Sequence, residues 1–209
     1  MRAYLDDQPL ELDGESLTAA VVAGKRAADA RGRLIIEVWA DGEKAPAEDL
    51  ADPPEREPYA GEVRFVSVAP RALVAEALAE AAENLEAVRE PQREAAAALA
   101  RGETRDAMGL VGASLRAWES ARKALQESAE VLGVTPAQLA GPGPSQERCA
   151  AAIDDLLGAL REVQRSIHEQ DVASLADTLD YDLDELAGVW VDLLAEMSAS
   201  VRAGAESAS

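Results

Sequence analysis

Aromatic residues are scarce in this chain: Phe, Trp and Tyr together make up 3% of its 209 residues. Pockets for small ligands are usually lined by apolar and aromatic side chains around a few polar groups. A core built mainly from Ala, Leu, Val and Ile instead favours closely packed helices over a ring-lined ligand cavity. A chain of this length has room for one good core or two small ones.

Cysteine and histidine occur once each, as Cys149 and His168. A single cysteine excludes a disulfide within the chain and a zinc cluster built from several cysteines of one chain. Neither residue belongs to a recognisable motif of a nucleophile with its base. We therefore expect a protein that is not an enzyme and that needs no cofactor.

Basic residues are outnumbered two to one: 20 Lys and Arg stand against 40 Asp and Glu, which gives a net charge of −20. The excess runs through the whole chain, with 8 basic and 15 acidic residues up to residue 70 and 12 and 25 after it. Binding to nucleic acid or to an anionic membrane surface needs a basic stripe. The sequence has none, so we expect neither a nucleic acid nor a membrane as partner.

Long hydrophobic runs are also missing. No apolar run approaches the roughly 18 residues of a membrane-spanning helix, and the opening "MRAYLDDQPLEL" has no apolar stretch of the signal-peptide kind. We therefore expect a cytoplasmic protein. The 17 Arg against three Lys, together with abundant Ala, are typical of a bacterial genome of high GC content.

Residues 1–69 read as a small mixed domain. "RAYL" and "LEL" flank the polar "DDQP" and predict a hairpin. Ser16 is a candidate N-cap for a helix over "LTAAVVAGKRAADA". "RLIIEVW" is rich in β-branched residues, and "EVRFVSV" alternates strictly, which places Val63 and Phe65 on one face of a strand.

The order strand, strand, helix, strand, irregular segment, strand resembles the β-grasp or ubiquitin-like fold. The segment "RLIIEVWADGEKAPAEDL" is the most similar part, because it looks like the third strand of that family, its turn and the short helical loop that follows. Members that are conjugated or carry sulfur end in an exposed Gly-Gly. Here the last strand runs directly into Pro70, which argues against a ubiquitin-like modifier.

Residues 70–205 have helical periodicity. Four apolar seams, with spacings of three and four, begin at Val74, Met108, Cys149 and Val172, and Pro91 is expected to bend the first helix. A Pro- and Gly-rich connection at 133–145 separates two αα-hairpins. We therefore predict an α+β protein, in which a β-grasp-like domain at 1–69 precedes an antiparallel four-helix bundle at 70–205.

The segment "LADTLDYDLDEL", residues 175–186, is the most acidic part of the fourth helix. At about 100° per residue, Asp177, Asp180 and Asp184 fall on the side away from the apolar seam, so we expect them to be solvated. Acids at alternate positions also begin a calcium loop, but that loop needs glycine where Glu185 stands and an acid where Val191 stands. The segment therefore predicts no metal site.

Tyr181 is expected to lie nearly opposite the same seam, as an exposed aromatic residue among carboxylates. Exposed aromatics are enriched in protein contacts. The candidate contact residues are therefore Tyr181, Asp177 and Asp184.

Four functions remain open. The absence of a catalytic set favours an adaptor or chaperone-like protein that binds a protein partner of unknown identity. The second hypothesis is a self-assembling structural protein, a homo-oligomer through Ala79, Ala82, Ala96, Ala97 and Ala100. The helix count and the turn before "DVASLADTL" are similar to flagellin export chaperones, which gives a third. The least favoured is a metal-dependent enzyme that uses His168 and nearby acids such as Asp171.

Overall fold

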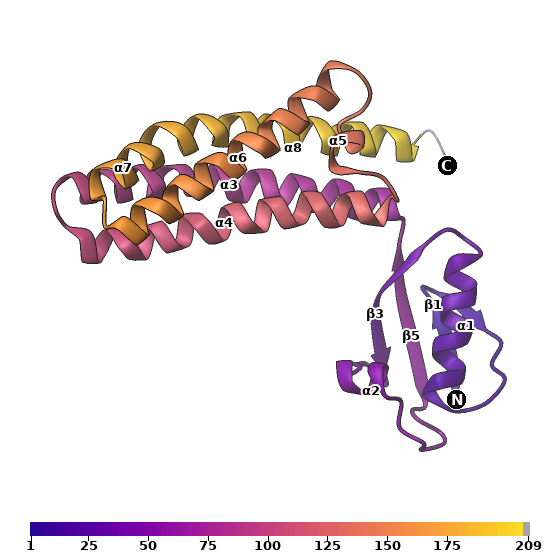
Figure 1. Cartoon of the computed structure of the whole chain (residues 1–209). Helices are drawn as coiled ribbons and strands as arrows, with labels where there is room; N and C mark the ends of the chain where they lie inside the picture. Colours follow the sequence, from indigo (N-terminus) through magenta and orange to yellow (C-terminus); the bar gives the residue numbers. More distant parts are fainter. Residues whose placement is uncertain (207–209) are drawn as a thin grey trace. The chain divides into compact units, whose positions relative to one another are not determined.

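A computed structural model of the chain describes residues 1–206 and has an α+β fold. The chain divides into two compact units, with the boundary between Leu73 and Val74. That boundary lies in the first turn of α3, which spans Pro70–Ala100. Figure 1 labels the larger elements of both units.

The first unit is a five-stranded sheet with a helix on one face. Its strands run in the order β2-β1-β5-β3-β4, and β1 pairs parallel to β5 while the other pairs are antiparallel. The hairpin predicted around "DDQP" is confirmed, because Leu5 pairs with Gln8. The elements are β1 Arg2–Leu5, β2 Gln8–Leu10, α1 Leu17–Asp29, β3 Leu34–Ala40, β4 Glu43–Lys44, α2 Ala47–Ala51 and β5 Glu62–Val68.

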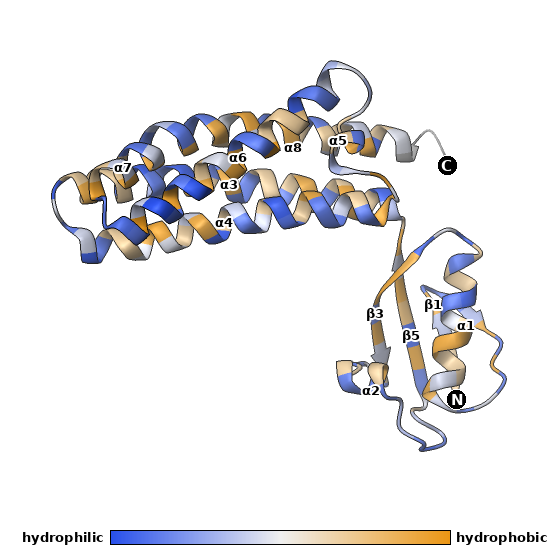
Figure 2. Ribbon diagram, in the orientation of Figure 1, coloured by the Kyte–Doolittle hydropathy of each residue, from blue (hydrophilic) through white to orange (hydrophobic). Residues whose placement is uncertain are grey.

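Local signals account for the main elements of this unit. Ser16 caps α1 as predicted, since its Oγ accepts a hydrogen bond from the N–H of Ala19 at 3.2 Å. The alternation of β5 is confirmed, with Val63 and Phe65 buried. Figure 2 shows that hydrophobic residues run along β3 and β5. Gly24 of α1 packs against the ring of Phe65, which brings the helix close to the sheet.

The second unit is helical. Its elements are α3, α4 Thr104–Val131, α5 Pro136–Leu139, α6 Pro144–Glu169, α7 Val172–Asp177, the π-helical turn η1 Thr178–Asp182 and α8 Leu183–Glu206. The helices contribute to one hydrophobic core. The predicted break at 133–145 is present, although the short α5 forms inside it. Pro91 does not end α3, which continues to Ala100.

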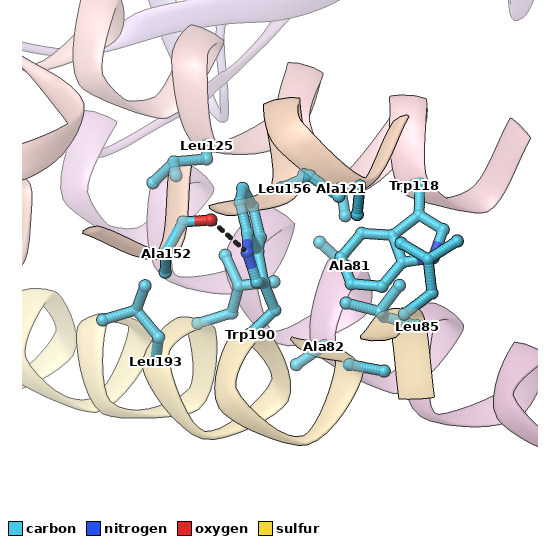
Figure 3. Close-up of a cluster of buried hydrophobic side chains, with 14 of the residues drawn as sticks. Ala81, Ala82, Leu85, Trp118, Ala121, Leu125, Ala152, Leu156, Trp190 and Leu193 are labelled. Atoms are coloured by element: carbon cyan, nitrogen blue, oxygen red, sulfur yellow. Dashed lines mark hydrogen bonds between the residues drawn. The ribbon is translucent and has the colours of Figure 1, made fainter. Parts of the chain in front are cut away.

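Two tryptophans lie at the centre of this core, as their places on the apolar seams predict. Trp118 of α4 and Trp190 of α8 are both fully buried, and their rings meet edge to face with centroids 5.9 Å apart. The indole N–H of Trp190 donates to the carbonyl oxygen of Ala152 at 3.2 Å, as Figure 3 shows. This bond satisfies the polar group of a buried aromatic residue and joins α8 to α6.

Among the helices of residues 1–206, none combines the length and the apolar character needed to cross a bilayer.

Candidate functional site

A π-helical turn interrupts the acidic segment that the sequence predicts to be continuous helix. At the end of η1 the N–H of Leu183 donates to the carbonyl of Thr178, five residues earlier, instead of to Leu179, four residues earlier. One extra residue per turn shifts the helical phase of everything that follows. The prediction of one uninterrupted helix from Val172 is therefore wrong at η1.

A buried amide accounts for the position of the π-helical turn. Gln92 of α3 is fully buried, and its Nε2 donates to the carbonyl oxygen of Leu179 at 2.9 Å. Its Oε1 accepts the indole N–H of Trp118 at 3.1 Å. The carbonyl of Leu179 does not receive the N–H of Leu183, as it would in an α-helix. The side chain of Gln92 from α3 satisfies it instead.

Asp184 corrects the sequence prediction of a solvated carboxylate. It is half-buried and binds α3: Nε and Nη2 of Arg89 donate to its two oxygens at 3.1 and 3.2 Å, and Nη2 of Arg93 lies 3.0 Å from Oδ1. Burial acts to raise the pKa of Asp184, but the hydrogen bonds from Arg89 and Arg93 outweigh it and hold the pKa below its ordinary value. Its charge is therefore paired within the helical unit.

Tyr181 and Asp177 are exposed, as the sequence predicts. The Tyr181 side chain is 67% exposed, a large value for an aromatic residue. It projects from η1, whose backbone is held by Gln92, and it is flanked by Asp180 and the exposed Asp182. The contact role of Tyr181, Asp177 and Asp184 stays a prediction, and of the three Asp184 is the one that also binds α3.

A groove of about 570 Å³ lies between α6 and α8, beside η1; we call it the α6–α8 groove. The two helices run antiparallel along it. Arg148 of α6 pairs with Glu196 of α8, and the later residue Ala152 of α6 pairs with the earlier residue Trp190 of α8. Its lining consists of Arg148, Ala151, Ala152, Asp154, Asp155, Gly158, Ala159, Glu162, Asp182, Glu185, Leu186 and Val189.

The carboxylates of the groove are mostly free of internal partners. Glu162 binds Arg165 on its own helix. Within residues 1–206, no side-chain ion pair or hydrogen bond satisfies the other four, which are Asp154, Asp155, Asp182 and Glu185. The lone guanidinium of the lining, on Arg148, pairs with Glu196 at 2.8 Å. The groove therefore has a negative rim over a floor of small and aliphatic side chains.

A second groove, of about 650 Å³, lies between α3 and α8; we call it the α3–α8 groove. Of the alanines predicted to form a self-assembly face, Ala79 and Ala82 line it, although Ala82 is itself buried, and Ala96 is buried in the same core without lining the groove. Other lining residues are Glu83, Glu86, Ala87, Val191, Ala195, Ser198, Ala199 and Arg202.

The residues considered for metal or nucleophilic chemistry do not gather. His168 is exposed in the last turn of α6. The carboxylate of Asp171 instead accepts hydrogen bonds from the N–H and hydroxyl of Ser174. Cys149 is buried, and burial raises the pKa of its thiol. In the part of the chain that the structure describes, no three His, Cys, Asp or Glu residues are grouped to hold a metal ion.

Two residues important for this site were missed by sequence reasoning. Gln92 stands in the first apolar seam at the regular spacing Val88, Gln92, Ala95, so a polar residue on the apolar face was the available signal. Gly158 had no such signal, because the open space beside it depends on how α6 and α8 pack.

Comparison with family models, curated proteins and solved structures gives no match to this chain.

Proposed function

We propose that this chain is a non-enzymatic adaptor or chaperone-like protein that binds a protein partner through η1 and the adjoining α6–α8 groove. The observation that carries the proposal is the exposed ring of Tyr181 on a backbone turn that a buried side chain holds in place. Aromatic residues supply much of the binding energy of protein interfaces. A fixed backbone also lowers the conformational entropy that is lost on binding.

Two features near Tyr181 support a contact surface over a chance exposure. π-Helical turns occur frequently at functional sites, and this one requires a buried polar network that is otherwise costly to maintain. The next residue, Asp182, already lines the α6–α8 groove. A partner that covers Tyr181 can therefore reach the groove without crossing another element.

We further propose the finer fold assignment that the sequence suggests. The strand order β2-β1-β5-β3-β4, with a central parallel pair β1–β5, supports a β-grasp domain. The shared core of α3, α4, α6 and α8 supports a four-helix bundle. Its antiparallel character is supported by Ser198, which binds the carbonyl of Ala75, while Asp184 binds Arg89. A small interaction domain joined to a bundle is consistent with an adaptor.

Photo-crosslinking at Tyr181 tests this function. A photoreactive phenylalanine analogue replaces Tyr181 in the full chain, and crosslinked proteins from lysate of the source cells are identified by mass spectrometry. The matched control places the analogue at Val131, another exposed apolar residue of the same unit. A single protein crosslinked at 181 and lost from pull-downs with Tyr181→Ala, but kept with Val131→Ala, is expected. Equal crosslinking at both positions contradicts the proposal.

Self-assembly is the second candidate, and the α3–α8 groove favours it. Helices α3 and α8 run antiparallel, since Ser198 pairs with Ala75 while Asp184 pairs with Arg89. Arg202 of α8 therefore lies toward one end of the groove, and Glu83 of α3 lies toward the other. A two-fold axis through such a groove places the arginine of one copy near the glutamate of the other.

A charge swap tests self-assembly. Sedimentation at increasing concentration measures dimer formation, which Glu83→Arg or Arg202→Glu alone should weaken and the double variant should restore. A chain that remains monomeric at high concentration excludes this candidate.

A further inference from the structure

We propose that the α6–α8 groove receives an amphipathic helix of the partner whose apolar stripe is flanked by Lys and Arg. This inference rests on the proposed function and adds the chemistry of the partner. Three properties of the groove carry it: its length, its floor and the charge of its rim.

The length of the groove suits a short helix. From Arg148 to Glu162 its α6 side extends over fourteen residue steps, or roughly 21 Å at 1.5 Å per residue. Arg148, at one end of the groove, pairs with Glu196. A partner helix of about four turns fills this distance.

The floor of the groove leaves room for inserted side chains. Ala152 and Ala159 are buried and small, and Leu186 and Val189 supply aliphatic surface from α8. A Cβ added to Gly158 would meet no atom within 4 Å. Side chains of a second helix can therefore enter between α6 and α8, which is the helix-in-groove mode of recognition.

The charge of the rim selects a cationic partner. Asp154 and Asp155 come from α6, and Asp182 and Glu185 come from η1 and α8, so carboxylates stand on both sides of the floor. In residues 1–206 no group of acids is arranged to hold one metal ion. Several separate cations along a helix match this spread of charge better than a single ion does. The net charge of −20 also attracts such a partner over a distance and repels phosphate-rich ones.

Three fluorescent peptides of about 18 residues test the inference with the full-length protein. The first is a Leu, Ala and Lys helix with lysines on both flanks of its apolar stripe. The second replaces each Lys with Glu, and the third has the composition of the first in an order without an apolar stripe. Fluorescence anisotropy at physiological salt is expected to show binding of the first peptide alone. Equal binding of the third peptide overturns the inference, because charge without shape is then sufficient.

Variants locate the binding. Gly158→Leu fills the groove and is expected to weaken binding of the first peptide by about tenfold or more. Its control is Gly109→Leu, because Gly109 is also a helical glycine with open space around it, on α4. The double variant Asp155→Asn, Glu185→Gln should also weaken binding. Its control, Glu76→Gln with Glu80→Gln, removes the same charge from exposed positions of α3. Circular dichroism checks that each variant folds.

The outcomes separate this inference from the proposed function. If Gly158→Leu binds the first peptide as tightly as Gly109→Leu does, the groove is not the site and the inference is wrong. The proposed function survives that result as long as Tyr181 still crosslinks a specific protein. If the peptide binds in the groove and Tyr181 crosslinks nothing specific, the inference holds for a cationic helix while the proposed contact through Tyr181 is wrong.

Discussion

Trp118 donates its indole N–H to Oε1 of Gln92, 3.1 Å away, and the other end of the same amide donates to Leu179 of η1. A single buried side chain thus joins the tryptophan of α4 to the π-helical turn that carries Tyr181. Because Gln92 is fully buried, both of its partners are inaccessible to water and depend on it.

Gln92→Leu is expected to destabilise the helical unit by about 2–4 kcal/mol, since it leaves a buried N–H and a buried carbonyl unpaired. Urea unfolding followed by tryptophan fluorescence measures the free energy of unfolding. Gln146→Met is the control, because Gln146 is an exposed helical glutamine on α6. A loss no larger than that of the control means that Gln92 does not support the turn.

Asp184→Asn tests the ion pairs with Arg89 and Arg93, and we expect it to cost about 1–3 kcal/mol at neutral pH. The pKa of Asp184 is lowered in the folded protein, so its contribution is complete above the ordinary value of 3.8 and is lost as pH falls through the lowered pKa. The stability difference between wild type and variant should therefore shrink in acid.

Urea unfolding at several pH values between neutral and acid checks this dependence. Asp177→Asn is the control, because Asp177 is exposed on α7. We expect that control to change stability little at any of these pH values. A difference between wild type and Asp184→Asn that stays constant into acid contradicts the role given to the ionised carboxylate.

The sequence predicted most elements because their signals are local. The alternation of "EVRFVSV", the cap at Ser16 and the seam positions of Trp118 and Trp190 depend only on neighbours along the chain, and each was confirmed. Asp184 was wrongly assigned to the solvated side. Its partner Arg89 lies 95 residues away, and the π-helical turn shifts the helical phase of α8 relative to α7. The grooves were not predictable, since they depend on which helices face each other.

Gly24→Ala tests how closely α1 approaches the sheet. The added Cβ would lie 3.0 Å from ring atoms of Phe65, so the ring or the helix must shift. The expected cost is about 1–3 kcal/mol, although alanine has the higher helix propensity. Thermal unfolding followed by circular dichroism measures the change.

Gly158→Ala is the matched control for this prediction, because its new Cβ meets open space on α6. Without a clash only the propensity gain remains, and we expect the variant to be more stable by about 0.5–1 kcal/mol. If the two substitutions change stability in the same direction by similar amounts, close packing of Gly24 on Phe65 does not decide the effect.

Cys149 makes the opening of the helical unit measurable with a thiol reagent. Its Sγ is buried beside α5 and lies 3.6 Å from the carbonyl oxygen of Pro136, and burial raises the pKa of the thiol. Burial limits the access of a disulfide reagent to the thiol, and the raised pKa lowers the fraction of reactive thiolate. We expect reaction in the native state to be much slower than in urea, and to accelerate with low urea as the unit opens. Since Cys149 is the only cysteine, the signal has one source. A native rate equal to the rate in urea shows that α5 does not cover the thiol in solution.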